Sequence, residues 1–381
     1  MANRLADVYG TLLVVRPPVP ATVNKAGANY KSEVTHVEYS PRRAYDEWMS
    51  ICEGIAAFGG DALFDFEAAD EPLLDAGDLE VDAAGAIHPV GSREQLAHMD
   101  DVLTGRVFTA NGPWVVVDGK TLRAVMPAML PHRRAEAPYY RALLEGLAGA
   151  GGYDLVAQDD PHRWEGMADV AVAGDKVVLT YTVAGHYDAG VGTKSMRSSR
   201  EGVAFAAEFA GVPETARIYA ELVYPHFHGD TVHFGARPAR GGAVLVRYGG
   251  GLYGDDDDRV ARELGAGRTV AIAREDAVEH YAGNSRQVGA GVLVPDGVSE
   301  AFERSLSELG LKTRRVSLFE LFGKAGGGPA CATLYLPKSL QIPKSCPLRY
   351  SARRDQVRAR RERIPTRLLV DPEFFAGKQR G

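Results

Sequence analysis

The stretch Phe322-Gly323-Lys324-Ala325-Gly326-Gly327-Gly328-Pro329-Ala330-Cys331 runs into the apolar segment Ala332-Thr333-Leu334-Tyr335-Leu336. Consecutive glycines let a backbone approach a ligand closely, and the apolar segment has the composition of a strand. Cys331 therefore stands at a predicted loop-to-strand junction. A thiolate held there can attack an electrophilic carbon if neighbouring groups activate it and move protons. The competing interpretation is a small buried thiol beside a tight turn, which is the commoner role of a single cysteine.

The composition of the chain is that of an ordinary globular protein. Of its 381 residues, 45% are hydrophobic and 25% are charged, which allows one large domain or two. The net charge of -6 gives no electrostatic reason to expect a nucleic-acid partner. Residues 351–363 are locally basic but contain no interleaved aromatic residues, so we interpret them as a solvated helix or tail.

The cysteines and the start of the chain indicate a cellular compartment. Cys52, Cys331 and Cys346 show neither paired spacing nor a zinc-like cluster, which favours a reducing environment over a disulfide framework. The first ten residues carry no apolar signal-peptide core, and no apolar run approaches membrane-spanning length. We therefore expect a cytoplasmic protein without a membrane partner.

Strand-like and helix-like segments alternate along the chain. The predicted strands are residues 12–15, 114–117, 177–181, 244–248 and 292–294. The predicted helices that follow them are residues 44–58, 136–147, 202–209, 259–264 and 298–309. Five strand-then-helix units suit either a two-layer α/β arrangement or a ring of similar modules. No glycine-rich dinucleotide motif or phosphate-binding loop accompanies them, so no cofactor is predicted.

A histidine-rich segment offers a proton-transfer group. If it forms a strand, as its alternation suggests, His226, His228 and Asp230 face the same side, which places a general acid/base beside a carboxylate. A metalloenzyme that uses His226, His228 and His233 is the less favoured alternative, because the chain marks no further metal ligands.

Two short turns supply further polar groups. Glu165 and Asp169 lie in a glycine-containing turn, and together with a thiol and an imidazole they would suit a cationic, planar electrophile such as a guanidinium. Asn111 precedes Gly112, so its amide is expected either to contact the same ligand or to form a type I′ turn.

The motifs of this chain, taken together, resemble those of the guanidino-group-modifying enzymes. These enzymes include dimethylarginine hydrolases, arginine deiminases and dihydrolases, and amidinotransferases, and the nearest resemblance is to bacterial dimethylargininase-like hydrolases. The residues that match are Phe108-Thr109-Ala110-Asn111-Gly112, Glu165-Gly166-x-x-Asp169, Arg197-Ser198-Ser199-Arg200, His228-x-Asp230-Thr231, Asn284, and Lys324-Ala325-Gly326-Gly327-Gly328-x-x-Cys331. The resemblance covers about residues 105–337, with a looser match at 12–58.

This resemblance implies a fold and a domain organisation. The expected fold is the α/β pentein fold, a pseudo-fivefold α/β propeller of ββαβ modules, which agrees with the five units counted above. The expected organisation is a single catalytic domain over residues 1–381 with a basic C-terminal extension at 347–381. One departure is Gly229, which stands where the family usually has leucine.

The resemblance also implies roles for the site residues. Cys331 would be the nucleophile and His228 the general acid/base. Glu165 and Asp230 would bind the guanidinium, with Asn111 and Asp169 as further substrate contacts. Arg197 or Arg200 would hold a substrate carboxylate, or else these arginines simply begin a helix that Ser199 caps.

Three functions follow from these expectations. The favoured one is a cysteine-dependent hydrolase of arginine or a related guanidino compound, which acts through a covalent amidino-cysteine intermediate. The first alternative is an amidinotransferase that passes the amidino group to an amine. The second is a non-catalytic binding protein on the same fold, as among ribosome anti-association factors. The partner expected in each enzymatic case is a small guanidino substrate, and the surface would tolerate a homodimer.

Overall fold

The computed structural model describes residues 10–18, 38–64, 107–130, 136–186, 196–239 and 241–362, together with 5, 7, 79–81, 86–89, 133, 364 and 366–369. Five small three-stranded sheets dominate this part of the chain. In each sheet the middle strand has one antiparallel and one parallel neighbour, and a helix connects the parallel pair.

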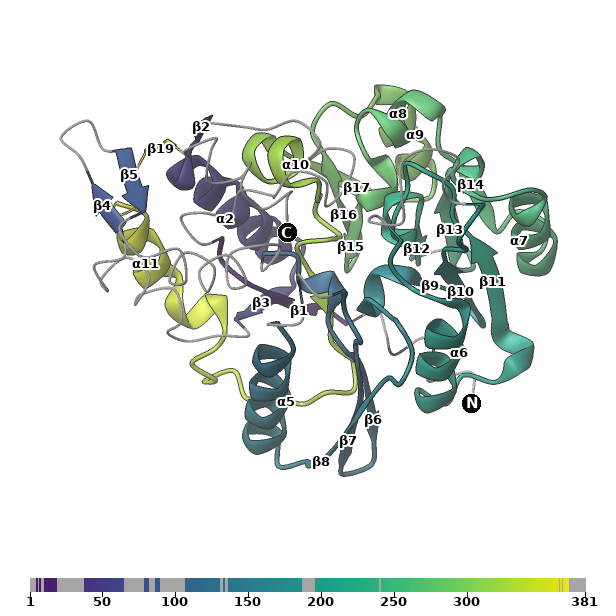
Figure 1. The fold of residues 1–381 in the computed structure, drawn as a ribbon, viewed down its shortest axis with the longest axis horizontal. Coiled ribbons are helices and arrows are strands. Elements are labelled where there is room, and N and C mark those ends of the chain that lie inside the picture. The colour runs from purple at the N-terminus through teal and green to yellow at the C-terminus, as the bar shows by residue number, and fades with distance from the viewer. Residues whose placement is uncertain are drawn as a thin grey trace.

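Each sheet with its helix forms one ββαβ module (Figure 1). The first two modules are β6 (Trp114–Asp118), β7 (Thr121–Met126), α5 (Ala137–Gly151) and β8 (Asp154–Asp159), and β9 (Val170–Ala173), β10 (Lys176–Tyr181), α6 (Arg200–Phe209) and β11 (Arg217–Glu221). The next two are β12 (His233–Ala236), β13 (Val244–Arg247), α7 (Asp256–Leu264) and β14 (Thr269–Ala271), and β15 (Arg286–Val288), β16 (Gly291–Pro295), α9 (Glu300–Glu308) and β17 (Lys312–Val316). Helices α5, α6, α7 and α9 lie toward the periphery.

The fifth module joins the two ends of the described chain. Strand β1 (Leu12–Val15) pairs antiparallel with β18 (Leu334–Tyr335) and, across α2 (Pro41–Ala57), parallel with β3 (Asp61–Phe64). Leu13 lies opposite Tyr335 in this sheet. An early strand therefore completes the sheet that contains the segment after Cys331, and this pairing closes the ring of modules. The predicted pentein architecture is confirmed.

The five predicted strands and five predicted helices are all present, although several helices begin earlier than expected. Helix α2 begins at Pro41 because Ser40 caps it, with Ser40 Oγ accepting a hydrogen bond of 3.3 Å from Arg43 N. Helix α7 begins at Asp256, and its acidic first turn favourably meets the positive end of the helix dipole. The strand at the middle of each module is mainly apolar because both of its faces are largely covered; β16 is fully buried, whereas β7, β10 and β13 also carry polar residues.

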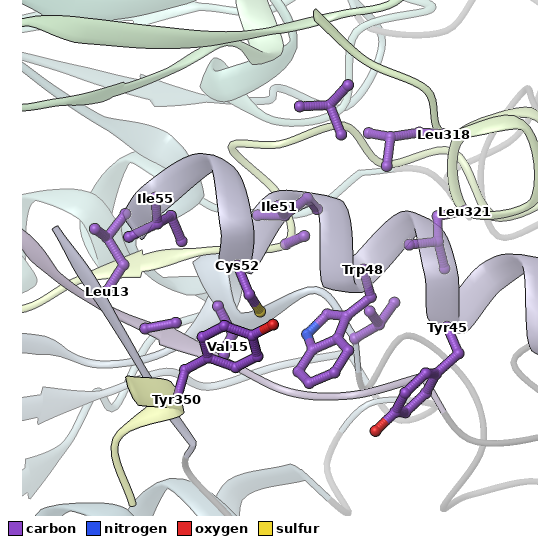
Figure 2. Close-up of a cluster of buried hydrophobic side chains, with 14 of the residues drawn as sticks. Leu13, Val15, Tyr45, Trp48, Ile51, Cys52, Ile55, Leu318, Leu321 and Tyr350 are labelled. Atoms are coloured by element: carbon purple, nitrogen blue, oxygen red, sulfur yellow. The ribbon is translucent and has the colours of Figure 1, made fainter. Parts of the chain in front are cut away.

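Helix α2 packs through its apolar face on the sheet of β18, β1 and β3, which we name the closing sheet. Figure 2 shows Trp48, Cys52 and Ile55 of this helix facing Leu13 and Val15 of β1. Helix α10 (Phe319–Ala325), which precedes the glycine run, packs on the same cluster through Leu318 and Leu321. Glu47 of α2 also accepts hydrogen bonds of 2.9 Å from Glu320 N and 3.0 Å from Leu321 N, which caps α10. The core of the fifth module thus fixes the helix that leads to Cys331.

The remaining elements lie outside the five modules. They are α8 (Arg274–Val278), α11 (Tyr350–Arg361) and a four-stranded sheet of β2 (Glu38–Tyr39), β19 (Arg367–Leu369), β5 (Ala86–Pro89) and β4 (Leu79–Val81). The basic segment forms α11, a largely solvated helix whose Arg354 and Arg361 pair with Glu53 and Asp46 of α2. Most of residues 65–106 and all of 370–381 lie outside the described part, so the single-domain organisation stays a prediction. None of the described helices is long and apolar enough to cross a membrane.

Replacing Ile51 by alanine tests the packing of α2. The Ile51 side chain is completely buried in the cluster of Figure 2, so Ile51→Ala should lower the free energy of unfolding by about 2–5 kcal/mol, measured by urea denaturation. Val156→Ala, at a side chain that is 47% exposed, is the matched control and should change it by about 0.5 kcal/mol or less. Equal effects of the two substitutions would contradict this packing.

Candidate active site

Asn111, Asp169, Asp230, Asn284 and Cys331 lie on five equivalent turns, and Glu165 and His228 each directly precede one of them. Each turn comes directly before the first strand of one module. The turns are η2 (Thr109–Asn111) before β6, η4 (Gly166–Asp169) before β9, η7 (Gly229–Thr231) before β12, η9 (Ala282–Asn284) before β15, and the Ala330-Cys331 turn before β18. Because the modules form a ring, these turns converge, and each contributes side chains to one buried site.

Hydrogen bonds join each turn to the next around this ring. Asn111 Nδ2 donates to Glu165 O at 2.9 Å, and Gly229 N donates to Asp169 Oδ1 at 2.8 Å. Asn284 Nδ2 donates to Asp230 O at 2.9 Å and Asn284 Oδ1 accepts from Cys331 N at 3.0 Å. The fifth turn returns to the first, since Ala110 N donates to Cys331 O at 3.0 Å. We name this set the turn ring.

Cys331 faces a carboxylate and an amide. Its Sγ lies 3.2 Å from Asp230 Oδ2 and 2.9 Å from Asn284 Nδ2. Burial, and next the charge of Asp230, raise the pKa of the Cys331 thiol well above its usual range, whereas Asn284 opposes that rise. Burial also raises the pKa of Asp230. In this structure Cys331 is therefore a thiol that donates to Asp230.

His228 is oriented by Glu165. Its Nε2 lies 3.0 Å from Glu165 Oε2, and Glu165 Oε2 also lies 3.2 Å from Arg197 Nη1. Burial favours a neutral Glu165, but the charges of Arg197 and His228 outweigh it and hold the pKa of Glu165 well below its usual range. An ionised carboxylate can only accept, so Nε2 carries the proton in this pair and Nδ1 is the nitrogen left to exchange a proton.

The carboxylate of Glu165 is engaged by protein groups, and its expected contact with a guanidinium stays a prediction. Its Oε1 accepts from Leu130 N at 3.0 Å, and its Oε2 already meets His228 and Arg197. The side chain is fully buried among these partners. Within the described chain this carboxylate orients His228, and the acceptor beside Cys331 is Asp230.

Neither arginine suggested for a substrate carboxylate stands open in the site. Arg197 is buried against Glu165 and lies 5.5 Å from the Phe227 ring centroid. Arg200 lies over the ring of Tyr219, 5.0 Å from its centroid, away from the turn ring. Ser199 caps α6 by accepting from Gly202 N at 3.1 Å, as the alternative interpretation of this segment required. The geometry thus gives no support to carboxylate binding by either arginine.

Asp169 stabilises the turn ring by accepting hydrogen bonds from neighbouring segments. Besides Gly229 N, its carboxylate accepts from Thr180 Oγ1 at 2.9 Å and from Ser198 Oγ. A Cβ on Gly229 would come within 2.2 Å of Thr180 Oγ1. Glycine is therefore needed at position 229, where the resemblance led us to expect leucine, because Thr180 already fills that space to reach Asp169. Asp169 holds the His228 turn and does not contact Cys331 in the described structure.

Asn111 and Gly112 do not form a type I′ turn. It ends a short 3-10 helix, and the following Gly112 has a φ of -79°, whereas a type I′ turn requires positive φ at both central residues. Its Nδ2 lies 3.3 Å from His228 Nε2. The turn prediction is wrong, and the side chain instead lies beside the imidazole.

Two site residues had no role in the sequence-based expectations. Asn284 was matched as part of a motif, but its double contact with Cys331 depends on a fold that brings residues 47 positions apart together. Arg133 donates from Nη1 to Asn111 Oδ1 and is itself held by Glu136 through Nε at 2.6 Å and Nη2 at 2.8 Å. This contact fixes which end of the Asn111 amide faces His228. The local sequence around Arg133 offers no signal that would have singled it out.

The histidines do not assemble as the strand prediction required. His228 precedes a 3-10 helix instead of continuing a strand, because residues 229–231 form η7. His226 Nδ1 lies 3.1 Å from Thr231 Oγ1, and burial lowers the pKa of His226 to about 4. Burial and then Arg247 lower the pKa of His233 to about 3. No group of three or more His, Cys, Asp or Glu side chains among the described residues is arranged to hold a metal ion.

Removing the charge of Asp230 should make Cys331 more reactive. Asp230→Asn eliminates a carboxylate that raises the pKa of the thiol, so more thiolate should be present at pH 8. We expect alkylation of Cys331 by iodoacetamide, followed by peptide mass spectrometry, to become about tenfold faster because the pKa of the thiol is lower. Asp154→Asn, at an exposed site, is the control. Unchanged or slower alkylation in Asp230→Asn would contradict the assigned contact.

Comparison with known proteins identifies the fold. No protein-family model matches the sequence, and no curated protein matches it either. Among solved structures, a substrate-bound cysteine-to-serine mutant of the N-terminal domain of ArgZ, an arginine dihydrolase from the ornithine-ammonia cycle in cyanobacteria, superposes with a TM-score of 0.60 at 20% identity, covering 86% of this chain and 98% of that one.

Two further solved structures are similar. AgrE in complex with ornithine and NAD+ has a TM-score of 0.60 at 20% identity over 88% of this chain and 40% of that chain. A dimethylarginine dimethylaminohydrolase adduct with S-methyl-L-thiocitrulline has a TM-score of 0.53 at 14% identity over 85% of this chain and 99% of that chain. Together with the five ββαβ modules, these similarities show that the chain has the pentein fold, the fold of the guanidino-modifying enzymes.

Proposed function

We propose that this protein is a cysteine-dependent hydrolase of a guanidino compound, arginine or an arginine derivative, and that it acts through a covalent amidino-cysteine intermediate. The observation that carries the proposal is the contact of Cys331 Sγ with Asp230 Oδ2 at 3.2 Å, on the same turn ring as the His228–Glu165 pair. A nucleophile, an acceptor for a cation and a proton carrier are the three groups that guanidinium hydrolysis requires.

Substrate binding would itself activate Cys331. A guanidinium placed beside Asp230 brings a positive charge next to the thiol, which lowers the thiol pKa that burial and Asp230 raise in the empty site. Loss of the Sγ proton also frees Asp230 Oδ2 to accept a guanidinium N–H. The proton can leave through His228 Nδ1, since the other nitrogen is committed to Glu165. The buried thiol is thus kept unreactive until a cation arrives.

The chemical steps then balance as two displacements. The thiolate forms a bond to the central guanidinium carbon, and one C–N bond breaks as the departing amine takes a proton from His228. Water next gives a proton to His228 and attacks the adduct, forming a C–O bond. The C–S bond breaks, which returns Cys331 and releases a product in which oxygen replaces the lost nitrogen.

The comparisons favour water over an amine as the second nucleophile. Two of the similar structures are of the arginine dihydrolase ArgZ, and in one of these the protein is covalently bound to a reaction intermediate. Another is a dimethylarginine dimethylaminohydrolase. These are hydrolytic enzymes that act on guanidino groups. Amidino transfer remains the alternative and requires that an amine enter the site after the first product leaves. The cytoplasmic location and the homodimer stay predictions.

A binding protein without catalysis is the competing class. Such a protein needs no nucleophile, yet here an asparagine amide and a carboxylate both contact one buried thiol, and an imidazole ordered by Glu165 belongs to the same turn ring. Burying Glu165, Arg197 and Asp230 together costs desolvation free energy that an inert core would avoid. This arrangement favours the enzymatic proposal.

Turnover of a panel of guanidino compounds tests the proposal. Arginine, methylated arginines and other guanidines are incubated with the protein, with and without an amine acceptor, and the released amine or ammonia and the carbonyl product are measured. Cys331→Ala should reduce turnover by about a thousandfold or more, whereas Cys346→Ala, at a buried cysteine of another cluster, should retain it. Turnover that survives in Cys331→Ala would overturn the proposal, and turnover that depends on the acceptor would establish transfer instead.

Arg133 should act as a positioning residue for this reaction. Arg133→Leu removes the donor that fixes Asn111, whose Nδ2 donates to Glu165 O, so the Glu165 turn that orients His228 should shift and kcat should fall by about tenfold or more, with a small change in KM. Arg133→Lys should recover part of the loss because lysine can still donate to Asn111 Oδ1.

Two measurements separate this role from a general loss of structure. The rate of Cys331 alkylation should be unchanged in Arg133→Leu, because the contacts described for Arg133 are with Asn111, Phe108 and Glu136. Arg141→Leu, which removes an exposed partner of Asp159, should leave kcat unaffected. A parallel loss of kcat and of selective Cys331 labelling would show that Arg133 serves only the fold.

A further inference from the structure

A cavity lies at the end of the β18-β1-β3 sheet that is remote from Cys331. Its volume is about 730 Å3, which is within the range of small-molecule sites. It is formed where four segments meet: the starts of β1 and β3, the chain after β18, and the start of α11. The turn after α2 forms one wall through Gly59 and Gly60, and a Cβ on Gly59 would meet nothing within 4 Å.

Some of the charged side chains around this cavity are paired with an opposite charge, and others are not. Asp61, the acidic residue in its lining, is neutralised by Arg349 Nη1 at 3.1 Å and accepts from Ser351 Oγ at 2.7 Å. Arg354 is paired with Glu53. Arg349 is further fixed by donating to Ile342 O at 2.7 Å and Pro343 O at 2.9 Å. These pairs stabilise the walls and leave their charges balanced.

Lys338 and Lys344 are the unbalanced charges. Both side chains line the cavity and are exposed, and neither has a carboxylate partner in the described part of the chain. Thr11 and Gln341 add polar groups to the same lining. Two ammonium groups that face a space of this size attract a multiply charged anion, and lysine is a common phosphate ligand.

The location excludes this cavity from the proposed chemistry. Thr109 Oγ1 donates to Val14 O at 2.9 Å near the end of β1 that leads to the turn ring, whereas Leu12 at the other end of β1 lines the cavity. Cys331 comes before β18, and Pro337 and Lys338 of the cavity come after it. The nucleophile and the cavity thus lie at opposite ends of the strands of one three-stranded sheet.

We propose that this cavity is a binding site for a small phosphate-bearing anion, which Lys338 and Lys344 hold. The site is distinct from the proposed active site and does not depend on it. A ligand there would contact the start of β1 and the chain just after β18, the strand that follows the Cys331 turn.

Calorimetric titration with inorganic pyrophosphate, in the absence of any guanidino compound, tests the proposal. The unmodified protein should bind pyrophosphate at one site and more tightly than citrate. Lys338→Gln/Lys344→Gln should weaken the affinity by about tenfold or more, because each substitution removes a charged donor. Lys338→Arg/Lys344→Arg should retain most of it.

The matched control is Lys120→Gln/Lys312→Gln, which makes the same change in net charge at two exposed positions outside the cavity. Its affinity for pyrophosphate should equal that of the unmodified protein. Equal weakening by both double substitutions would show non-specific attraction and overturn the proposal. Citrate binding more tightly than pyrophosphate, or no binding of pyrophosphate at all, would overturn it as well. Because binding is measured without turnover, these outcomes are independent of the hydrolase assay.

Discussion

The turn ring is the interaction on which the rest of this structure depends. Five short turns, one from each module, bond to one another in sequence, and the last returns to the first when Ala110 N donates to Cys331 O. A hydrogen bond left unmade in such a buried place costs about 1–3 kcal/mol, so each turn constrains its neighbours. The ring can close only if β1 enters the sheet of β18, and for this reason the early and late segments of the chain are inseparable from the site.

This constraint explains why so many charged side chains can be buried together. Arg133 is shared between Glu136 and Asn111, and Arg197 is held against Glu165. Buried charges are tolerated when their partners are fixed in advance, and here the turns provide that fixation. The result is an order of dependence: Arg133 orients Asn111, Glu165 orients His228, and Asn284 orients Cys331. The residues around the thiol are preorganised rather than assembled by substrate.

Much of the fold could be predicted from the sequence because the middle strand of each module is largely covered on both faces and mainly apolar, as in β16. The sequence also singled out Cys331, His228 and Asp230 as candidates because their residue types and contexts are chemically distinctive, and the structure brings Cys331 and Asp230 into contact. Local periodicity failed at His228, where hydrogen bonds between turns replace strand pairing. Local periodicity gave no indication of Arg133, because its role depends on its contact with Asn111, which lies on another segment. The same reason hid the role of Asn284.

The central claim is that Cys331 becomes covalently attached to the amidino group of a guanidino compound, and intact-protein mass spectrometry after rapid acid quenching tests it most directly. The account predicts a transient mass increase equal to an amidino group, located on the peptide that contains Cys331, which disappears in water as product accumulates. The absence of any such adduct with every guanidine tested, or an adduct on Cys52 or Cys346 instead, would contradict it.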